Sequence, residues 1–409
     1  MIPADVAARA GTRLHALDAI RASALLLGIC LHASLSLVPT RGLVFWPVSD
    51  VQQSTALTVA GFVIHIFRMS VFFLVAGLLA RALVESRGVV AFLRNRAARI
   101  LVPLVLGWVL CFALLVGVGL WLLAKANNGE LPSPLPTAML DAGLNFLHLW
   151  FLYLLLWLYA ISLAMRSALL CIDKSGSVSR MLDATVAHCI SSRAGPLALA
   201  APVVVALSVI PNWSIGMGVP TPAYTLVPPA TSLFIYLYVF VLGWAMHRQL
   251  HLLAELAKRW SVNFCFGLIG ALFSLHLAAA QPDPASVLSG AYHLLGAAAY
   301  GIALVCLTFA FVGLGCRYFS QESPVVRYLA DASYWMYIIH LPLVMALQTA
   351  LMYEDLHWSI KFLLINALGA GLLLLTYHCG VRYTWVGRLL NGARRPRRTG
   401  LVHTKAAAL

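Results

Sequence analysis

The sequence has 409 residues, of which 61% are hydrophobic and only 10% are charged, and its formal net charge at pH 7 is +14. Because soluble domains carry about 25% charged residues, this composition excludes a soluble globular protein and indicates an integral membrane protein. The positive charge does not indicate nucleic-acid binding, since lysine and arginine concentrate in alternate loops. The eight cysteines are scattered and form no C-x-x-C pair, so we predict neither a disulfide framework nor a metal site.

Apolar stretches of helical length recur along the chain, and we predict an all-α, polytopic membrane protein with about ten transmembrane helices. The first stretch is too long for a cleaved signal peptide and lacks a small-residue cleavage site, so we expect an uncleaved signal anchor. The expected spans are residues 16–38, 57–80, 100–124, 147–166, 196–211, 228–247, 262–281, 292–314, 333–352 and 359–381.

The charges of the loops predict the orientation of these spans. Loops after odd-numbered spans contain few basic residues, whereas loops after even-numbered spans are rich in arginine and lysine. By the positive-inside rule this alternation places both termini in the cytoplasm. We expect a transmembrane domain over residues 1–393 and a basic cytoplasmic tail over 394–409, which begins R-R-P-R-R. The tail contacts either anionic lipid headgroups or a dedicated partner.

Arg21 and His32 lie in the first span, in the sequence R-A-S-A-L-L-L-G-I-C-L-H. Eleven residues of helix return to within about 20° of the same face and rise by about 16 Å, so both side chains share one face at different depths. Ionisable side chains inside a membrane are costly, which makes them candidates for function. Asp18 is placed to pair with Arg21 in a structural role. The alternatives are an Arg21 that reaches the headgroups and a hydrogen-bonded structural His32.

The second span contains H-I-F-R-M-S, which places His65 and Arg68 on one face, with Arg68 near the middle of the span. A guanidinium at that depth must line water, pair with an anion or bind a ligand. We expect no acidic residue at this depth in any other span. The anion that neutralises Arg68 is therefore either a structural partner or the substrate.

The second cytoplasmic loop ends in R-N-R-A-A-R-I-L-V-P, which brings Arg94, Arg96 and Arg99 to the membrane surface. The positive-inside bias explains part of this cluster. Guanidinium groups also match phosphate oxygens, so a phosphate-binding patch is an equally supported interpretation.

Two further segments carry histidines. His148 and Trp150 open the fourth span at its periplasmic side, where they are either interfacial residues or contacts to a sugar. His340 precedes Pro342, which frees a backbone carbonyl and bends the helix, so His340 either caps freed carbonyls or takes part in the reaction. No Ser-His-Asp order, Walker loop, H-E-x-x-H or dinucleotide-binding turn is present, which leaves the histidines and arginines as the candidate chemistry.

Several of these segments, in this order, resemble the bacterial membrane acyltransferase-3 family. They are Arg21-x10-His32, F-R-M-S-V-F-F-L-V-A-G at 67–77, R-x-x-R-I-x-x-P ending at Pro103, H-L-W-F-L at 148–152 and S-Y-W-M-Y-I-I-H-L-P at 333–342. The first span and H-I-F-R-M resemble most closely the glucan succinyltransferase branch of the family. Two departures are the lack of room for the periplasmic hydrolase-like domain of many relatives, and Ala76 where many relatives have serine, which excludes a serine acyl-enzyme there.

The resemblance implies a ten-span enzyme of the bacterial inner membrane that moves succinyl groups from cytoplasmic succinyl-coenzyme A to periplasmic glucans. It further implies that Arg21 and His32 are essential and that Arg68 matters. Succinyl-coenzyme A is then a co-substrate, and no bound cofactor, metal or nucleic acid is expected. Membrane lipids are expected partners, and assembly of identical copies is left open.

Our hypothesis for the reaction makes His32 the general base on a glucan hydroxyl. Arg68, assisted by His65, holds the succinyl carboxylate or the thioester oxygen. The expected donor-binding residues are Arg21, Arg94, Arg96 and Arg99, and the expected acceptor-binding residues are His148, Trp150 and His340. The alternatives are a covalent acyl-histidine, acetyl transfer to a polysaccharide or lipid head group, and a transporter for an anionic metabolite.

Overall fold

The computed structural model describes residues 15–39, 46–135, 145–211, 213–280 and 289–392, and these ranges contain helices and no strand. The predicted all-α class is therefore confirmed. Eight helices in the described ranges are long and apolar enough to cross a membrane, or up to nine when one bent pair is counted as a single span. The expected count of about ten and the cytoplasmic termini stay predictions, and the tail over 394–409 lies outside the described residues.

The helices are numbered along the chain. They are α2 (His15–Ser34), α3 (Thr55–Arg96), α4 (Val102–Ala126), α6 (Trp150–Ile172), α7 (Ser177–Ser191), α8 (Gly195–Ser208), α9 (Ala230–Met246), α10 (Leu252–Ala279), α11 (Ser289–Tyr318), α12 (Pro324–Leu351), α13 (Trp358–Thr376) and α14 (Trp385–Asn391). Shorter helical turns are η1 (Leu35–Leu37), η2 (Ala97–Leu101), η3 (Leu147–Leu149), η4 (Ile215–Met217), η5 (His247–Gln249) and η6 (Tyr377–Val381).

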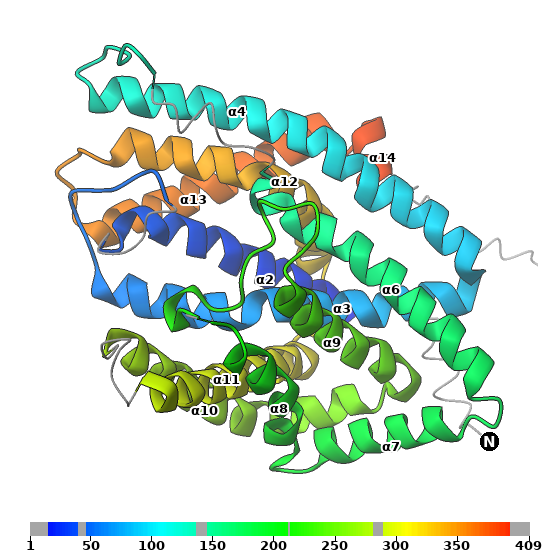
Figure 1. Ribbon diagram of the computed structural model, residues 1–409. Coiled ribbons are helices and arrows are strands. Elements are labelled where there is room, and N and C mark those ends of the chain that lie inside the picture. Colours follow the sequence, from blue (N-terminus) through cyan, green and yellow to red (C-terminus); the bar gives the residue numbers. More distant parts are fainter. Residues whose placement is uncertain (1–14, 40–45, 136–144, 212, 281–288, 393–409) are drawn as a thin grey trace, which may run out of the picture.

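Two of the expected spans fall within one continuous helical stretch, Thr55–Ala126, which has 72 residues. At about 1.5 Å per residue this stretch is far longer than the hydrocarbon core of a bilayer, which is about 30 Å thick. Gly88 interrupts it with φ 79°, a backbone conformation that glycine adopts without strain. Gly88 lies within α3, and η2 joins α3 to α4; the spans expected at 57–80 and 100–124 therefore lie on different helices, which Figure 1 shows as separate rods.

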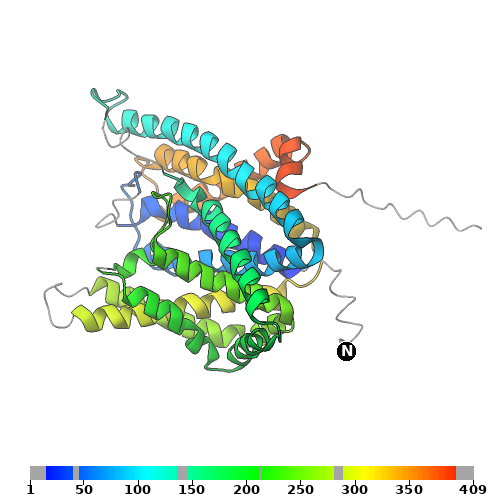
Figure 2. The same ribbon diagram turned by 45° about the vertical axis from the view of Figure 1, so that its right-hand side comes forward.

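Helix α2 occupies the centre of the bundle. It packs against α12 and α3 and also contacts α11 and α13. Figures 1 and 2 both show α4 on one outer side of the bundle and the pair α10 and α11 on the opposite side. The central position of α2 follows from its sequence, which is apolar on most faces, as expected for a helix surrounded by others.

Helix α3 is held in place by a close crossing with α9. A Cβ added to Gly77 would lie 1.9 Å from the backbone oxygen of Phe240, and one added to Gly243 would lie 1.9 Å from that of Leu74. Small residues on both helices allow this approach, as is common between membrane helices. The crossing fixes the helix that carries Arg68 and His65.

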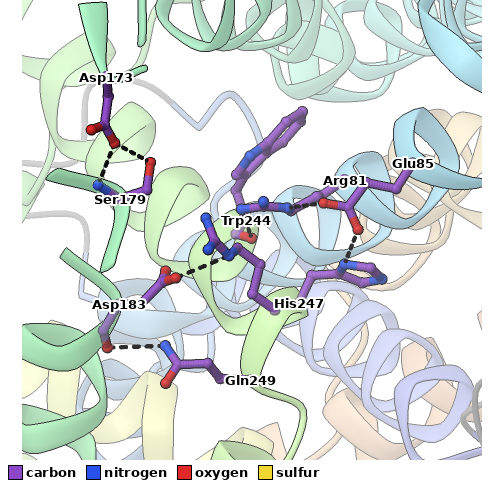
Figure 3. A network of polar contacts seen from close by, with 9 residues as sticks. Arg81, Glu85, Asp173, Ser179, Asp183, Trp244, His247 and Gln249 are labelled. Atoms are coloured by element: carbon purple, nitrogen blue, oxygen red, sulfur yellow. Dashed lines mark hydrogen bonds and ion pairs between the residues drawn. The ribbon is translucent and has the colours of Figure 1, made fainter. Parts of the chain in front are cut away.

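The basic segment between the fourth and fifth expected spans contains a helix, α7, that the loop analysis did not predict. Its start is capped by Asp173, whose carboxylate accepts hydrogen bonds of 2.8 Å from both the backbone N–H and the hydroxyl of Ser179 (Figure 3). Helix α8 has only 14 residues, too few to cross a bilayer alone, and α7 joins it at a bend of 113°. The expected span 196–211 therefore corresponds to the second arm of a bent pair.

A polar network joins α3, α7 and the end of α9 (Figure 3). Glu85 lies 2.6 Å from Arg81 Nε and 3.2 Å from His247 Nδ1, and Arg248 lies 2.9 Å from Asp183. Glu85 thus pairs with Arg81 within α3 and with His247 of η5, and Asp183 of α7 pairs with Arg248 of η5.

Candidate active site

One large cavity of about 1910 Å³, formed by the described residues, is lined by most of the predicted site residues. One end, here called the arginine end, is lined by Arg21, Arg96 and Arg99. The part of the cavity beside the last turn of α2, here called the Trp46 end, includes Trp46, which stacks on His32. The middle is lined by His32, His65, Arg68, His148, Trp150 and His340.

Arg68 reaches the cavity across a glycine of α2. A Cβ added to Gly28 would lie 2.1 Å from Arg68 Nη1, so only glycine leaves room for the guanidinium here. Gly28 precedes His32 by one turn of α2. The guanidinium of Arg68, which comes from α3 and contacts Gly28, therefore lies about one helical turn from the imidazole of His32. Arg68 Nε has no hydrogen-bond partner, and no carboxylate among the described residues forms an ion pair with Arg68.

Three histidines from distant parts of the sequence form a row beside Arg68. The ring centroids of His32 and His340 are 5.2 Å apart, and those of His148 and His340 are 4.9 Å apart. His65 lines the same cavity, with its Nε2 3.3 Å from the carbonyl of Met217. The structure thus brings together imidazoles from α2, α3, η3 and α12.

Pro342, which lies inside α12, explains part of this arrangement. Proline lacks an N–H, so the carbonyl of Ile338 loses its helical donor. His148 Nε2 donates to that carbonyl at 2.9 Å, and the Cys111 thiol also donates to it at 2.9 Å. His340 Nδ1 instead donates to the carbonyl of Tyr337 at 2.8 Å. The freed carbonyl is therefore capped by His148 and Cys111, and not by His340.

These bonds decide which ring nitrogens stay open. His148 Nδ1, His340 Nε2 and His32 Nδ1 are buried and have no hydrogen-bond partner among the described residues. A neutral imidazole that donates through one nitrogen accepts through the other. Each of these histidines therefore has a ring nitrogen free for a proton or a ligand.

The arginine end holds two of the three arginines of R-N-R-A-A-R. The guanidinium of Arg96 lies over the rings of Phe92 and Tyr159, at 5.4 and 5.6 Å from their centroids. Arg99 packs against Gly392, where an added Cβ would lie 1.8 Å from Nη2. Arg96 thus contacts aromatic rings and Arg99 contacts the backbone of a glycine. Neither guanidinium forms an ion pair with a carboxylate among the described residues.

Arg94 does not belong to this group, although its position in the sequence suggested that it does. It is exposed and does not line the cavity. Two residues of helix turn by about 200°, so Arg94 and Arg96 point to different faces. Arg21 lines the cavity, and its Nη1 lies 3.9 Å from Asp18 Oδ1, as their spacing suggested.

The sequence analysis missed three residues of this site. Gly28 could have been found from its place one turn before His32, because a bare face there admits a neighbouring side chain. Trp46 stacks on His32 with ring centroids 5.5 Å apart, and Gln348 hydrogen-bonds Trp46. No local pattern predicts these contacts, since Gln348 lies 302 residues from Trp46 in the sequence.

One comparison with known proteins identifies the kind of protein. A family model described as an acyltransferase domain matches residues 14–381, which include every histidine and arginine placed above in the cavity. No curated protein and no solved structure gave a significant match.

Proposed function

Because the chain belongs to this acyltransferase family and is a multi-pass membrane acyltransferase, we propose that it moves succinyl groups from succinyl-coenzyme A to hydroxyl groups of a periplasmic glucan. The observation that carries the proposal is the large cavity that connects the arginine end with His32 and Arg68 and continues to the Trp46 end. In this proposal the protein lies in a bacterial inner membrane, with the arginine end towards the cytoplasm.

The arginine end supplies a site for the donor. Coenzyme A carries phosphates, and Arg96 and Arg99 offer guanidinium groups that face the cavity. Along α2 the rise from Arg21 to His32 is about 16 Å, a length that an extended pantetheine arm can cover. A donor held by its phosphates at this end therefore brings its thioester to the middle of the membrane.

The middle of the cavity supplies the groups that acyl transfer needs. His32 takes the proton of the acceptor hydroxyl, whose oxygen attacks the thioester carbonyl. The carbon–sulfur bond then breaks, the acyl group stays on the acceptor oxygen, and the coenzyme A thiolate takes the proton from His32. Arg68 lies one helical turn away and stabilises negative charge on the thioester oxygen or on the acyl chain.

An acidic acyl group explains why Arg68 has no carboxylate partner among the described residues. An unpaired cation inside a membrane is costly, and a succinyl carboxylate would neutralise it when the donor binds. Acetyl transfer to a polysaccharide or lipid head group is the nearest alternative, and it offers Arg68 no such anion.

The test is to incubate the purified protein with succinyl-coenzyme A and a periplasmic glucan, and to measure free thiol and the mass of the glucan. We expect thiol release together with succinylated glucan, and slower turnover with acetyl-coenzyme A. Arg68→Met should lower succinyl transfer more than acetyl transfer. Equal or faster acetyl transfer would reject the succinyl assignment, and uptake of an anion without thiol release would favour a transporter.

A further inference from the structure

We propose that Gln348 and Trp46 are positioning residues that hold the imidazole of His32 in its reactive orientation. We also propose that the buried ion pair of Asp50 and Lys361 anchors the segment that carries Trp46. Both statements rest on the proposed role of His32 as the base. None of these four residues has a part in the reaction as described so far.

His32 lacks the polar partner that usually fixes a reactive histidine. In many enzymes a carboxylate binds the second ring nitrogen and sets the orientation of the imidazole. His32 Nδ1 is buried without a hydrogen-bond partner among the described residues, and the ring instead contacts two others. Trp46 stacks on it at 5.5 Å and 24°, and His340 lies at 5.2 Å and 49°. Ring packing therefore sets the orientation of this imidazole.

Gln348 links the backbone of His32 to the indole of Trp46. Gln348 is only 1% exposed. Its Nε2 donates to the backbone carbonyls of His32 at 2.8 Å and of Ala33 at 3.2 Å. Its Oε1 accepts from Trp46 Nε1 at 3.1 Å. Carbonyls in the last turn of a helix lack full helical partners, so one amide satisfies the end of α2 and fixes the ring that covers His32.

The segment after Trp46 is anchored by a buried ion pair. Lys361 Nζ lies 2.6 Å from Asp50 Oδ1, and the two side chains are 0% and 2% exposed. The backbone N–H of Asp50 also donates to the carbonyl of Ser36, at 2.9 Å. A buried ion pair adds little net stability, because desolvation offsets the attraction, but it can specify one arrangement of the chain. The ion pair therefore holds the segment that follows Trp46 against α13, and the backbone hydrogen bond to Ser36 holds it against η1.

The test compares variants that remove each contact, and all but Trp46→Leu keep the side-chain volume nearly constant. They are Trp46→Leu, Gln348→Met and the double variant Asp50→Asn/Lys361→Met. Steady-state kinetics with succinyl-coenzyme A should show kcat lowered by about tenfold to a hundredfold, as small misplacements of a reacting group produce, with KM for the donor unchanged. Trp46→Phe keeps a ring over His32 and should recover most of the lost kcat.

Matched controls lie outside the cavity. Trp335 donates from Nε1 to the hydroxyl of Thr376 at 3.1 Å, and Gln249 donates from Nε2 to the carbonyl of Asp183 at 3.0 Å. Trp335→Leu and Gln249→Met remove the same groups and should leave kcat unchanged. An equal loss of kcat in these controls would show general destabilisation and overturn the proposal.

The remaining outcomes separate this proposal from the proposed function. If His32→Ala abolishes transfer while Trp46→Leu and Gln348→Met keep wild-type kcat, the positioning proposal is wrong and the base assignment stands. If His32→Ala itself keeps wild-type kcat, the proposed function fails first. A rise in KM with unchanged kcat would make Trp46 and Gln348 substrate contacts and also overturn the proposal. Should Trp46→Leu not fold, Gln348→Met and the double variant make the same comparison.

Discussion

Replacing Gly28 with alanine tests how closely the position of Arg68 controls the reaction. The new Cβ would lie 2.1 Å from Arg68 Nη1, whereas an ordinary contact begins at 3.4 Å, so the guanidinium must move by about 1.3 Å. The obstacle is the far end of a flexible side chain, so the backbone can stay in place. Displacement of a charge-stabilising group by about 1 Å costs on the order of a hundredfold in rate, which is about 2.7 kcal/mol of transition-state stabilisation.

The stability of this variant should change in the opposite direction. Alanine favours a helix over glycine by up to about 1 kcal/mol, so thermal unfolding in detergent should occur at an equal or higher temperature than in the wild type. Succinyl transfer, measured as free thiol and as succinylated glucan, should fall on the order of a hundredfold. The matched control is Gly61→Ala, at the same α2–α3 contact, where an added Cβ would lie 3.3 Å from Ser34 Oγ and 3.4 Å from Leu31 Cδ1. Wild-type transfer by Gly28→Ala would refute the role given to Arg68.

Three further predictions concern the donor site, the freed carbonyl of α12 and the start of α7. Arg99→Gln should raise KM for succinyl-coenzyme A about tenfold with little change in kcat, which corresponds to about 1.4 kcal/mol of binding free energy. Arg94→Gln, the control, should leave both constants unchanged. Equal effects of the two substitutions would contradict the separate placement of these arginines. His148→Leu leaves the carbonyl of Ile338 with the weaker thiol donor alone, so the free energy of unfolding should fall by about 1–3 kcal/mol, and an unchanged unfolding curve would contradict the capping role. Hydrogen bonds from Ser179 lower the pKa of Asp173 below its usual value, so its cap is present at neutral pH and is lost only as the pH falls through that lowered pKa. Hydrogen-exchange protection of the Ser179 amide should therefore persist through the ordinary aspartate range, and its loss above that range would contradict the assignment.

Apolar composition and the length of the apolar stretches were sufficient to predict the helical class and the positions of most long helices. Each expected span overlaps a helix of the structure, because a membrane helix must satisfy its backbone internally over a fixed length. The bent pair of α7 and α8 was missed, since its first arm is polar and reads as a basic loop. Asp173 accepts from the Ser179 amide six residues on, a longer spacing than an ordinary N-cap has, so no standard capping pattern predicts this arm.

The candidate site was predicted in part. Buried charge is costly, so Arg68, His32 and His340 could be selected from the sequence because they lie inside apolar stretches. The pairing of His148 with the carbonyl of Ile338 required the fold, because the two lie 190 residues apart. The contacts of Trp46 with Gln348 and His32 likewise join residues from separate parts of the sequence and required the fold. Spacing within one helix therefore allowed site residues to be predicted, whereas contacts between helices could not be predicted from the sequence.

The most direct test of the account is the turnover of purified His32→Ala with succinyl-coenzyme A and a glucan. His276→Ala is the matched control, because His276 is exposed in the last turn of α10 and does not line the cavity. The account predicts a folded His32→Ala protein that forms no succinylated glucan, beside a His276→Ala protein with wild-type turnover. Succinylated glucan formed by His32→Ala at the wild-type rate would contradict it.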